Sequence, residues 1–224
     1  NGNTNRTLTL PDEAGTILTD AKTAPGGLNS MQVFTTSGTW TKPAGVTKVK
    51  VYVTGGGGGS ASTPGDRAND MGVGGAAGGT AIKIIDVSSV ASVSVTVGTG
   101  GAGGGGIAGG GGTSSFGSYC SAVGGDGSTD NVAYQVVAGG TATGGDINLK
   151  GGGPGAGAIN SFTATPAGAG GAGGASFWSG GGSGGNATNV ANSGNHGSGG
   201  GGQFNATSTA PSGGAGIVVV EEYA

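Results

Sequence analysis

The chain has 224 residues, 60 of them glycine, with only 5% aromatic and 33% hydrophobic residues, which excludes one large conventional core. A net charge of −3 without a basic stripe excludes nucleic acid and anionic membranes as partners. The single Cys120 excludes a disulfide framework, and we expect it to be a small buried side chain in the strand-like segment 118–123.

Residues 1–28 have the pattern of a short hairpin followed by a linker. Residues 7–10 alternate between Thr and Leu, a turn follows at 11–15, and 16–19 form the return strand. A hairpin this short is marginal alone, so it needs partners from the next part of the chain or from copies of itself. We therefore predict a trimer-forming stem segment over 1–28 and a second, glycine-rich unit over 29–224.

Strand patterns bracket the glycine-rich region from both ends. Period-two alternation places Val49, Val51 and Val53 on one face of a strand. The continuous apolar run 217–220 predicts a central strand that is covered on both faces. We predict an all-β fold without α-helix of note, a β-sandwich-like framework supplied by residues 31–54, 80–97, 113–123 and 216–223.

The blocks of glycine between 55 and 216 predict polyglycine II helices. Disorder is opposed by the scarcity of charge, an α-helix would lose about 1 kcal/mol per glycine, and collagen needs glycine at every third position with abundant proline. The polyglycine II helix is extended, with about three residues per turn and no internal hydrogen bonds. Its runs must bond to one another laterally, so we expect a bundle with glycine inside and Ala, Ser, Thr or larger residues facing outward.

Larger side chains interrupt the glycine blocks at intervals. We expect these segments to be the turns at the ends of the bundle. Only in these turns can the chemistry of the side chains vary. They are residues 60–71, 128–137, 158–166, 176–179, 186–196 and 203–212.

The order of the motifs is more specific than any one glycine block. Residues 34–59 lead from Phe-Thr-Thr-Ser-Gly-Thr-Trp through an alternating strand into five glycines, and similar junctions follow at 93–106, 112–117 and 214–223. This series resembles the glycine-rich distal domains of bacteriophage tail fibres and tail-fibre adhesins. A remoter likeness is to the glycine-rich domain of anaplastic lymphoma kinase.

The resemblance implies a homotrimeric virion protein at the distal end of a tail fibre. Its tip would bind a bacterial outer-membrane receptor, either a protein or lipopolysaccharide, during adsorption to the host. In related T-even-like adhesins the turns between polyglycine helices bear the receptor contacts. The turn sequences differ here, which leaves the receptor open.

Phe177 and Trp178 are the sharpest candidates for binding residues, because two adjacent aromatics cannot both point into a bundle that needs backbone contact. They either cap the end of the bundle or anchor a partner. Other aromatics share this ambiguity, and polar turn residues are further candidates. The predicted receptor-binding residues are Phe177, Trp178, Tyr134, Phe162, Asn186, Asn195, His196 and Phe204.

Two alternative functions remain open. The pairs Asp66/Asp70 and Asp126/Asp130 could serve glycoside hydrolysis in a capsule depolymerase, although loop acids are usually turn formers. A bundle with Ala and Thr faces could bind ice, but the fibre-like segment 6–19 and the bulky turns argue against it. We expect no enzyme, no metal and no cofactor.

Overall fold

The framework strands form two five-stranded sheets packed face to face. The computed structural model describes residues 27–62, 72–129, 136–160, 167–186, 189–203 and 210–224. Every pairing within the two sheets is antiparallel. The first sheet has the order β1 (Leu28–Phe34), β14 (Ile217–Tyr223), β3 (Lys48–Thr54), β5 (Thr80–Asp86), β11 (Ile147–Leu149). The second has the order β10 (Ala142–Thr143), β9 (Cys120–Ala122), β8 (Ser114–Phe116), β6 (Ser92–Thr96), β2 (Gly38–Thr41).

The core lies between the two sheets, as the alternating sequence predicts. Val49, Val51 and Val53 are fully buried and meet Trp40 and Phe116 from the opposite sheet. The predicted central strand is confirmed, because β14 lies between β1 and β3 and its first four residues are buried. Cys120 is also buried, as expected.

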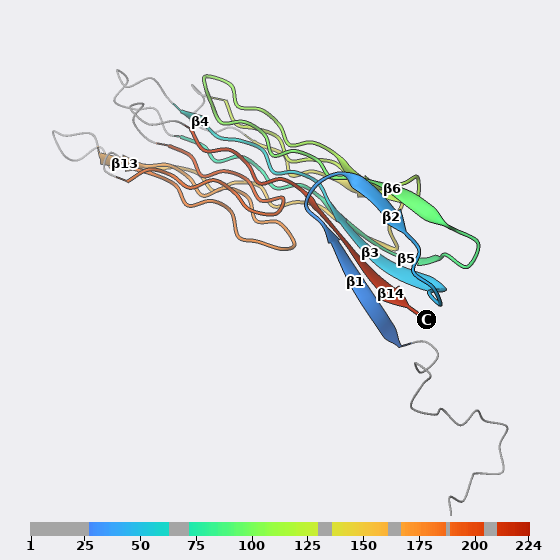
Figure 1. Ribbon diagram of the computed structural model, residues 1–224. Coiled ribbons are helices and arrows are strands. Elements are labelled where there is room, and N and C mark those ends of the chain that lie inside the picture. The colour runs from blue at the N-terminus through green and yellow to red at the C-terminus, as the bar shows by residue number, and fades with distance from the viewer. Residues whose placement is uncertain (1–26, 63–71, 130–135, 161–166, 187–188, 204–209) are drawn as a thin grey trace, which may run out of the picture.

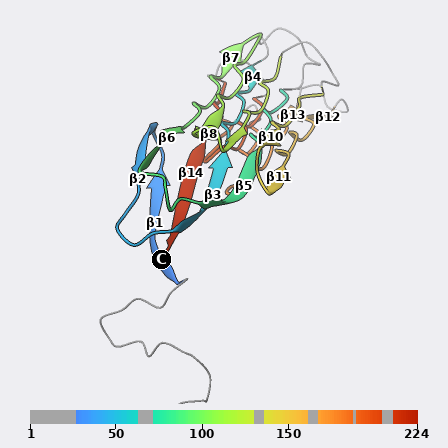
Figure 2. The ribbon, with the colours of Figure 1, turned by 90° about the vertical axis from the view of Figure 1, so that its right-hand side faces the viewer.

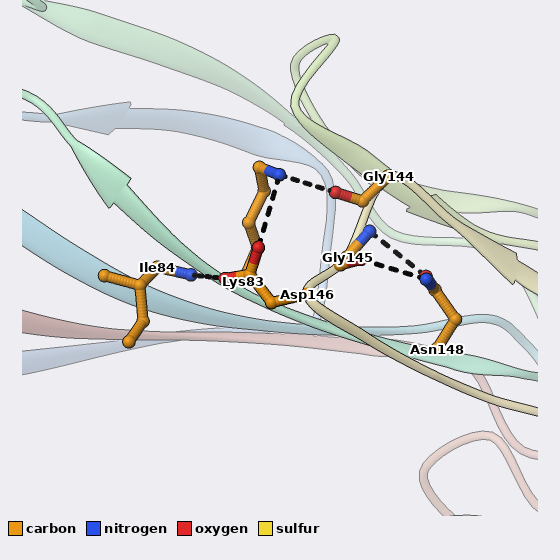
Figure 3. Close-up of polar contacts among 6 residues, drawn as sticks. All are labelled: Lys83, Ile84, Gly144, Gly145, Asp146 and Asn148. Carbon is orange, nitrogen blue, oxygen red and sulfur yellow. Dashed lines mark hydrogen bonds and ion pairs between the residues drawn. The ribbon is translucent and has the colours of Figure 1, made fainter.

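The strands β10 and β11 extend the framework beyond the predicted segments. A turn with Gly144 at φ +76° joins them. Asp146 accepts a 2.9 Å hydrogen bond from the backbone N–H of Ile84, a residue of β5 that lies beyond its last pair with β11. Lys83 donates to the Gly144 carbonyl at 2.7 Å and pairs with Asp146 at 3.7 Å (Figure 3). These contacts close one edge of the first sheet, where an open strand would offer free backbone groups.

The glycine runs extend away from the sandwich and back toward it, lying side by side (Figure 1). Eight of these runs begin or end next to a strand of the two sheets, so there the chain passes from sheet to bundle without a linker. The described residues contain no α-helix. Outgoing runs are 55–60, 98–104, 123–128, 150–157, 180–186 and 197–203, and returning runs are 72–79, 108–112, 137–141, 168–175, 189–195 and 210–216.

Hydrogen bonding in the bundle repeats every third residue. The backbone N–H groups of residues 55–60 donate, in order, to the carbonyls of Gly79, Gly112, Gly214, Ala76, Gly109 and Pro211, over 2.8–3.0 Å. Donors three residues apart therefore bond to the same neighbouring run, which is the geometry of a helix with three residues per turn. The lateral bonding predicted from the glycine blocks is confirmed.

The same run also receives hydrogen bonds from three further runs. The carbonyls of residues 56–60 accept, in order, from the N–H groups of Gly125, Gly101, Gly200, Ser128 and Gly104. Residues 55–60 are thus bonded to six runs, and they are fully enclosed. A Cβ at Gly57 would overlap the carbonyl of Ser198, so no larger residue fits at this position.

Outward positions accept larger residues, as predicted. Along the returning run 168–175 the exposed side chains are Ala169, Ala172 and Ala175. The segment 186–196, predicted to be one turn, instead contains a complete run that exposes Asn189, Asn192 and Asn195. Its backbone bonds laterally like the other runs: the Asn192 N–H donates to the Ser183 carbonyl at 3.0 Å. Polar residues occur here because only inward positions require glycine.

Candidate functional site

The bundle has two ends of different character. Its far end carries the short paired segments β4 (Ala61–Ser62), β7 (Gly104–Gly105), β12 (Ala158–Asn160) and β13 (Ala167–Ala169), which lie away from the sandwich in both views (Figures 1 and 2). Single bridges join further pairs there: Ser62 with Gln203, Ile107 with Thr129, and Ala169 with Asn186. Chain segments that are distant in sequence are therefore held together at this far end.

Of the eight predicted site residues the structure describes five, and these divide between the two ends. Tyr134, Phe162 and Phe204 lie outside the described residues. Asn186 lies at the far end itself, where its Oδ1 accepts the backbone N–H of Asn189 at 2.7 Å and closes a turn.

Gln203 is a residue of the far end that the sequence analysis did not single out. Its side chain is 1% exposed, and its Oε1 accepts the backbone N–H of Ala191 at 2.7 Å. Its Nε2 donates to the Asn186 carbonyl at 3.3 Å. A lone amide at the end of a four-glycine block was the available signal, because a buried polar side chain there must satisfy backbone groups that the turning chain leaves open.

Phe177 and Trp178 lie at the opposite end, where the bundle meets the sandwich. Their rings pack on Tyr52 of β3, with centroid distances of 6.0 Å from Phe177 and 5.5 Å from Trp178. The Trp178 Nε1 donates a 3.0 Å hydrogen bond to Thr54, which is itself bonded to Thr80. The two aromatics thus cover the joint between the glycine runs and the first sheet while remaining 47% and 37% exposed.

Asn195 and His196 form a tight turn beside this aromatic pair. His196 has a φ of +38° and Gly197 a φ of +80°, and the Ser198 N–H donates to the Asn195 carbonyl at 2.9 Å. Two successive positive φ values are the mark of a type I′ turn. The Ser176 hydroxyl donates to the His196 carbonyl at 2.8 Å, so the two turns at this end are tied together.

A shallow hollow of about 440 Å³ lies where the aromatic pair meets the outer face of the first sheet. Its lining is mainly apolar, with one carboxylate from Glu221. The Tyr223 hydroxyl donates to Glu221 at 2.8 Å, and this hydrogen bond raises the pKa of Tyr223. The lining residues are Met31, Val33, Tyr52, Phe177, Trp178, Ile217, Val219 and Glu221.

Neither end presents a recognisable catalytic or metal constellation in the part of the chain that the structure describes. No three His, Cys, Asp or Glu side chains gather there as metal ligands would. Asp126 is exposed and its carbonyl bonds to the Ala76 N–H, whereas Asp66, Asp70 and Asp130 lie outside the described residues. Within the same described ranges, no helix has the length and apolarity needed to cross a membrane.

Comparison with known proteins gives one family. The model of a glycine-rich domain matches residues 33–223, which covers the whole bundle and the sandwich except the first part of β1. No curated protein matches the chain significantly.

Proposed function

The chain belongs to the glycine-rich domain family, and from this premise we propose that it is the tip of a bacteriophage tail fibre that binds a bacterial surface receptor. The protein is then a virion component at the distal end of the fibre, acting without catalysis during adsorption. Its receptor is an outer-membrane protein or lipopolysaccharide, and its fibre is a homotrimer.

The observation that carries the proposal is the division between an invariable interior and a far end built from different segments. Inside the bundle a Cβ would meet neighbouring backbone at most glycines, so these positions tolerate no side chain. At the far end, described residues from different parts of the chain are instead paired through the bridges of Ser62, Ile107 and Ala169. A rigid support that leaves turn sequences free to vary suits recognition of a variable surface.

The proposal is tested by binding of the full labelled chain to a panel of Gram-negative strains, and to their purified lipopolysaccharide and outer-membrane proteins. We expect saturable binding to a subset of strains. Replacing residues 161–166 by a Gly/Ser segment of equal length should abolish or redirect it. Binding to no strain, lipopolysaccharide or outer-membrane protein would contradict the proposed function.

The predicted contacts at the sandwich end serve as the matched comparison. A Phe177→Ser or His196→Ala variant alters the end of the bundle that carries the aromatic joint. If these variants lose binding while the 161–166 replacement retains it, the receptor contacts lie at the sandwich end instead.

Ice binding is a second candidate, favoured by the regular outward rows. Ala169, Ala172 and Ala175, like Asn189, Asn192 and Asn195, are exposed at every third residue. At a rise of about 3.1 Å per residue, such rows repeat roughly every 9 Å along the bundle. Thermal hysteresis of the purified chain would support this reading, and its absence would remove it.

A further inference from the structure

The outer face of the first sheet exposes apolar side chains at its two lateral borders, while in its middle Tyr52 is packed by Phe177 and Trp178 and Val219 is buried. Cross-strand register places Val33, Val219, Tyr52, Ile82 and Ile147 in one row on this face, because directly paired residues point to the same side. The row crosses all five strands. Val33 and Ile147 at its two ends are each 52% exposed.

A second row lies further from the bundle and is apolar at both ends. It consists of Met31, Glu221, Lys50 and Ile84, with Met31 58% and Ile84 61% exposed. Both lateral borders of the face are therefore apolar, β1 on one side and β5 with β11 on the other. The charged side chains of Lys50 and Glu221 lie between these two apolar borders.

The charges on this face balance within one copy. Lys50 stands opposite Glu221, and Lys48 stands opposite Asp86, in paired strand positions. The face is thus neutral, without the single-signed charge that a strongly acidic or basic partner would match. A second surface of the same composition meets it without repulsion.

The outer face has the size of a small interface. Strands β1, β14, β3 and β5 have seven residues each. With about 3.3 Å per residue and 4.8 Å between strands, they span roughly 23 by 19 Å, or about 440 Å² in plane. Projecting side chains and the aromatic joint add to this area, but in a ring it is shared between two neighbouring copies, so each contact is smaller than the roughly 800 Å² per partner of a standard interface.

We propose that copies of this chain associate through the outer face of the first sheet. The apolar border of β1, carrying Met31 and Val33, meets the border of the next copy that carries Ile84 and Ile147. Because these borders differ, the contact is heterologous, and with a three-fold rotation between copies it closes a ring. The number of three copies rests on the proposed function, whereas the choice of surface rests on the exposed apolar rows. If the strands run parallel to the axis of the ring, the far ends of all bundles point the same way.

The test is the mass of the full chain in solution, measured by sedimentation equilibrium. Wild type is expected at three times the 20.4 kDa chain mass. A Val33→Lys/Ile84→Lys double variant should shift the equilibrium toward the monomer, beyond any association that residues 1–28 supply, since both side chains are exposed in one copy and lysine there does not disturb its core. Val136→Lys is the matched control, because Val136 is 94% exposed and lies near the far end, and it should leave the mass unchanged.

The outcomes separate this interface from the proposed function. A monomeric wild type, or a double variant that assembles as strongly as wild type, overturns the interface. Far-ultraviolet circular dichroism with a thermal melt checks that the double variant is folded. An assembled wild type that the double variant dissociates, but that binds no bacterial strain, leaves the interface standing and removes the receptor-binding proposal.

Discussion

The indole Nε1 of Trp40 donates a 2.7 Å hydrogen bond to Oε1 of Glu222, joining the second sheet to the first through the core. Both side chains are fully buried. Glu222 also accepts from Gln32 Nε2 at 2.7 Å and from the Ser30 hydroxyl, so β1, β2 and β14 converge on one carboxylate. These three donors are neutral groups, which makes each one important for holding the buried carboxylate.

Trp40→Phe is expected to lower the free energy of unfolding by about 2–3 kcal/mol, because it removes a donor to a buried carboxylate. Glu222→Gln should lower it less, since an amide oxygen still accepts from Trp40 and Gln32. Guanidinium unfolding followed by circular dichroism measures both. A Trp40→Phe variant as stable as wild type would show that the inter-sheet hydrogen bond contributes little.

Gly57→Ala should prevent the bundle from forming or destabilise it by more than about 3 kcal/mol, because the new Cβ would overlap the backbone of Ser198. Gly110→Ala is the matched substitution, since a Cβ there would lie 3.6 Å from the Gly125 carbonyl oxygen, in ordinary contact. It should be neutral or stabilise by up to roughly 1 kcal/mol. Thermal melts distinguish the two, and equal effects would contradict close backbone packing.

Trp178→Phe should destabilise the protein by about 1 kcal/mol, because it removes the donor to Thr54 while keeping an aromatic ring on Tyr52. Trp178→Ala should destabilise it further by exposing the joint. Under conditions where each variant is folded, binding to bacterial cells should match wild type. Loss of binding by folded Trp178→Phe would identify Trp178 as an anchor for the receptor.

Cys120 should react slowly with thiol reagents in the folded protein. Burial raises the pKa of its thiol from 9.0 to about 11, so at pH 8 its thiolate population is about 100-fold lower than in the unfolded chain. Between pH 9 and 11 the unfolded chain ionises while the folded protein keeps the proton. Stability should therefore fall as pH rises through this window, and Cys120→Ala should reduce the fall; rapid alkylation at pH 8 without denaturant would contradict the burial.

The strands with clear alternation could be predicted from the sequence, but two short strands of the framework could not. The alternation of Val49, Val51 and Val53 is enough to predict β3, and the run 217–220 indicates a central strand. The Ala142–Thr143 and Ile147–Leu149 strands contain only two and three residues. Their pairing is set by β9 and β5 rather than by a local pattern.

The placement of the turns depends on the direction of each run, which composition does not encode. Phe177 and Trp178 follow the returning run 168–175, so they meet the sandwich and not the far end. The segment that carries Asn189, Asn192 and Asn195 resembles a loop in sequence. The reason is that positions facing outward from the bundle do not need to be glycine, so polar residues occur there. Three-residue spacing of the larger residues is the signal that identifies such a run.

The continuity between strands and glycine runs has a mechanical consequence. The run 55–60 continues β3 directly, and its hydrogen bonds extend laterally to six neighbours. A pull applied along the bundle at its far end therefore loads many of these bonds in shear at once, instead of peeling them apart one by one. The protein is built to transmit tension along its length into the sandwich.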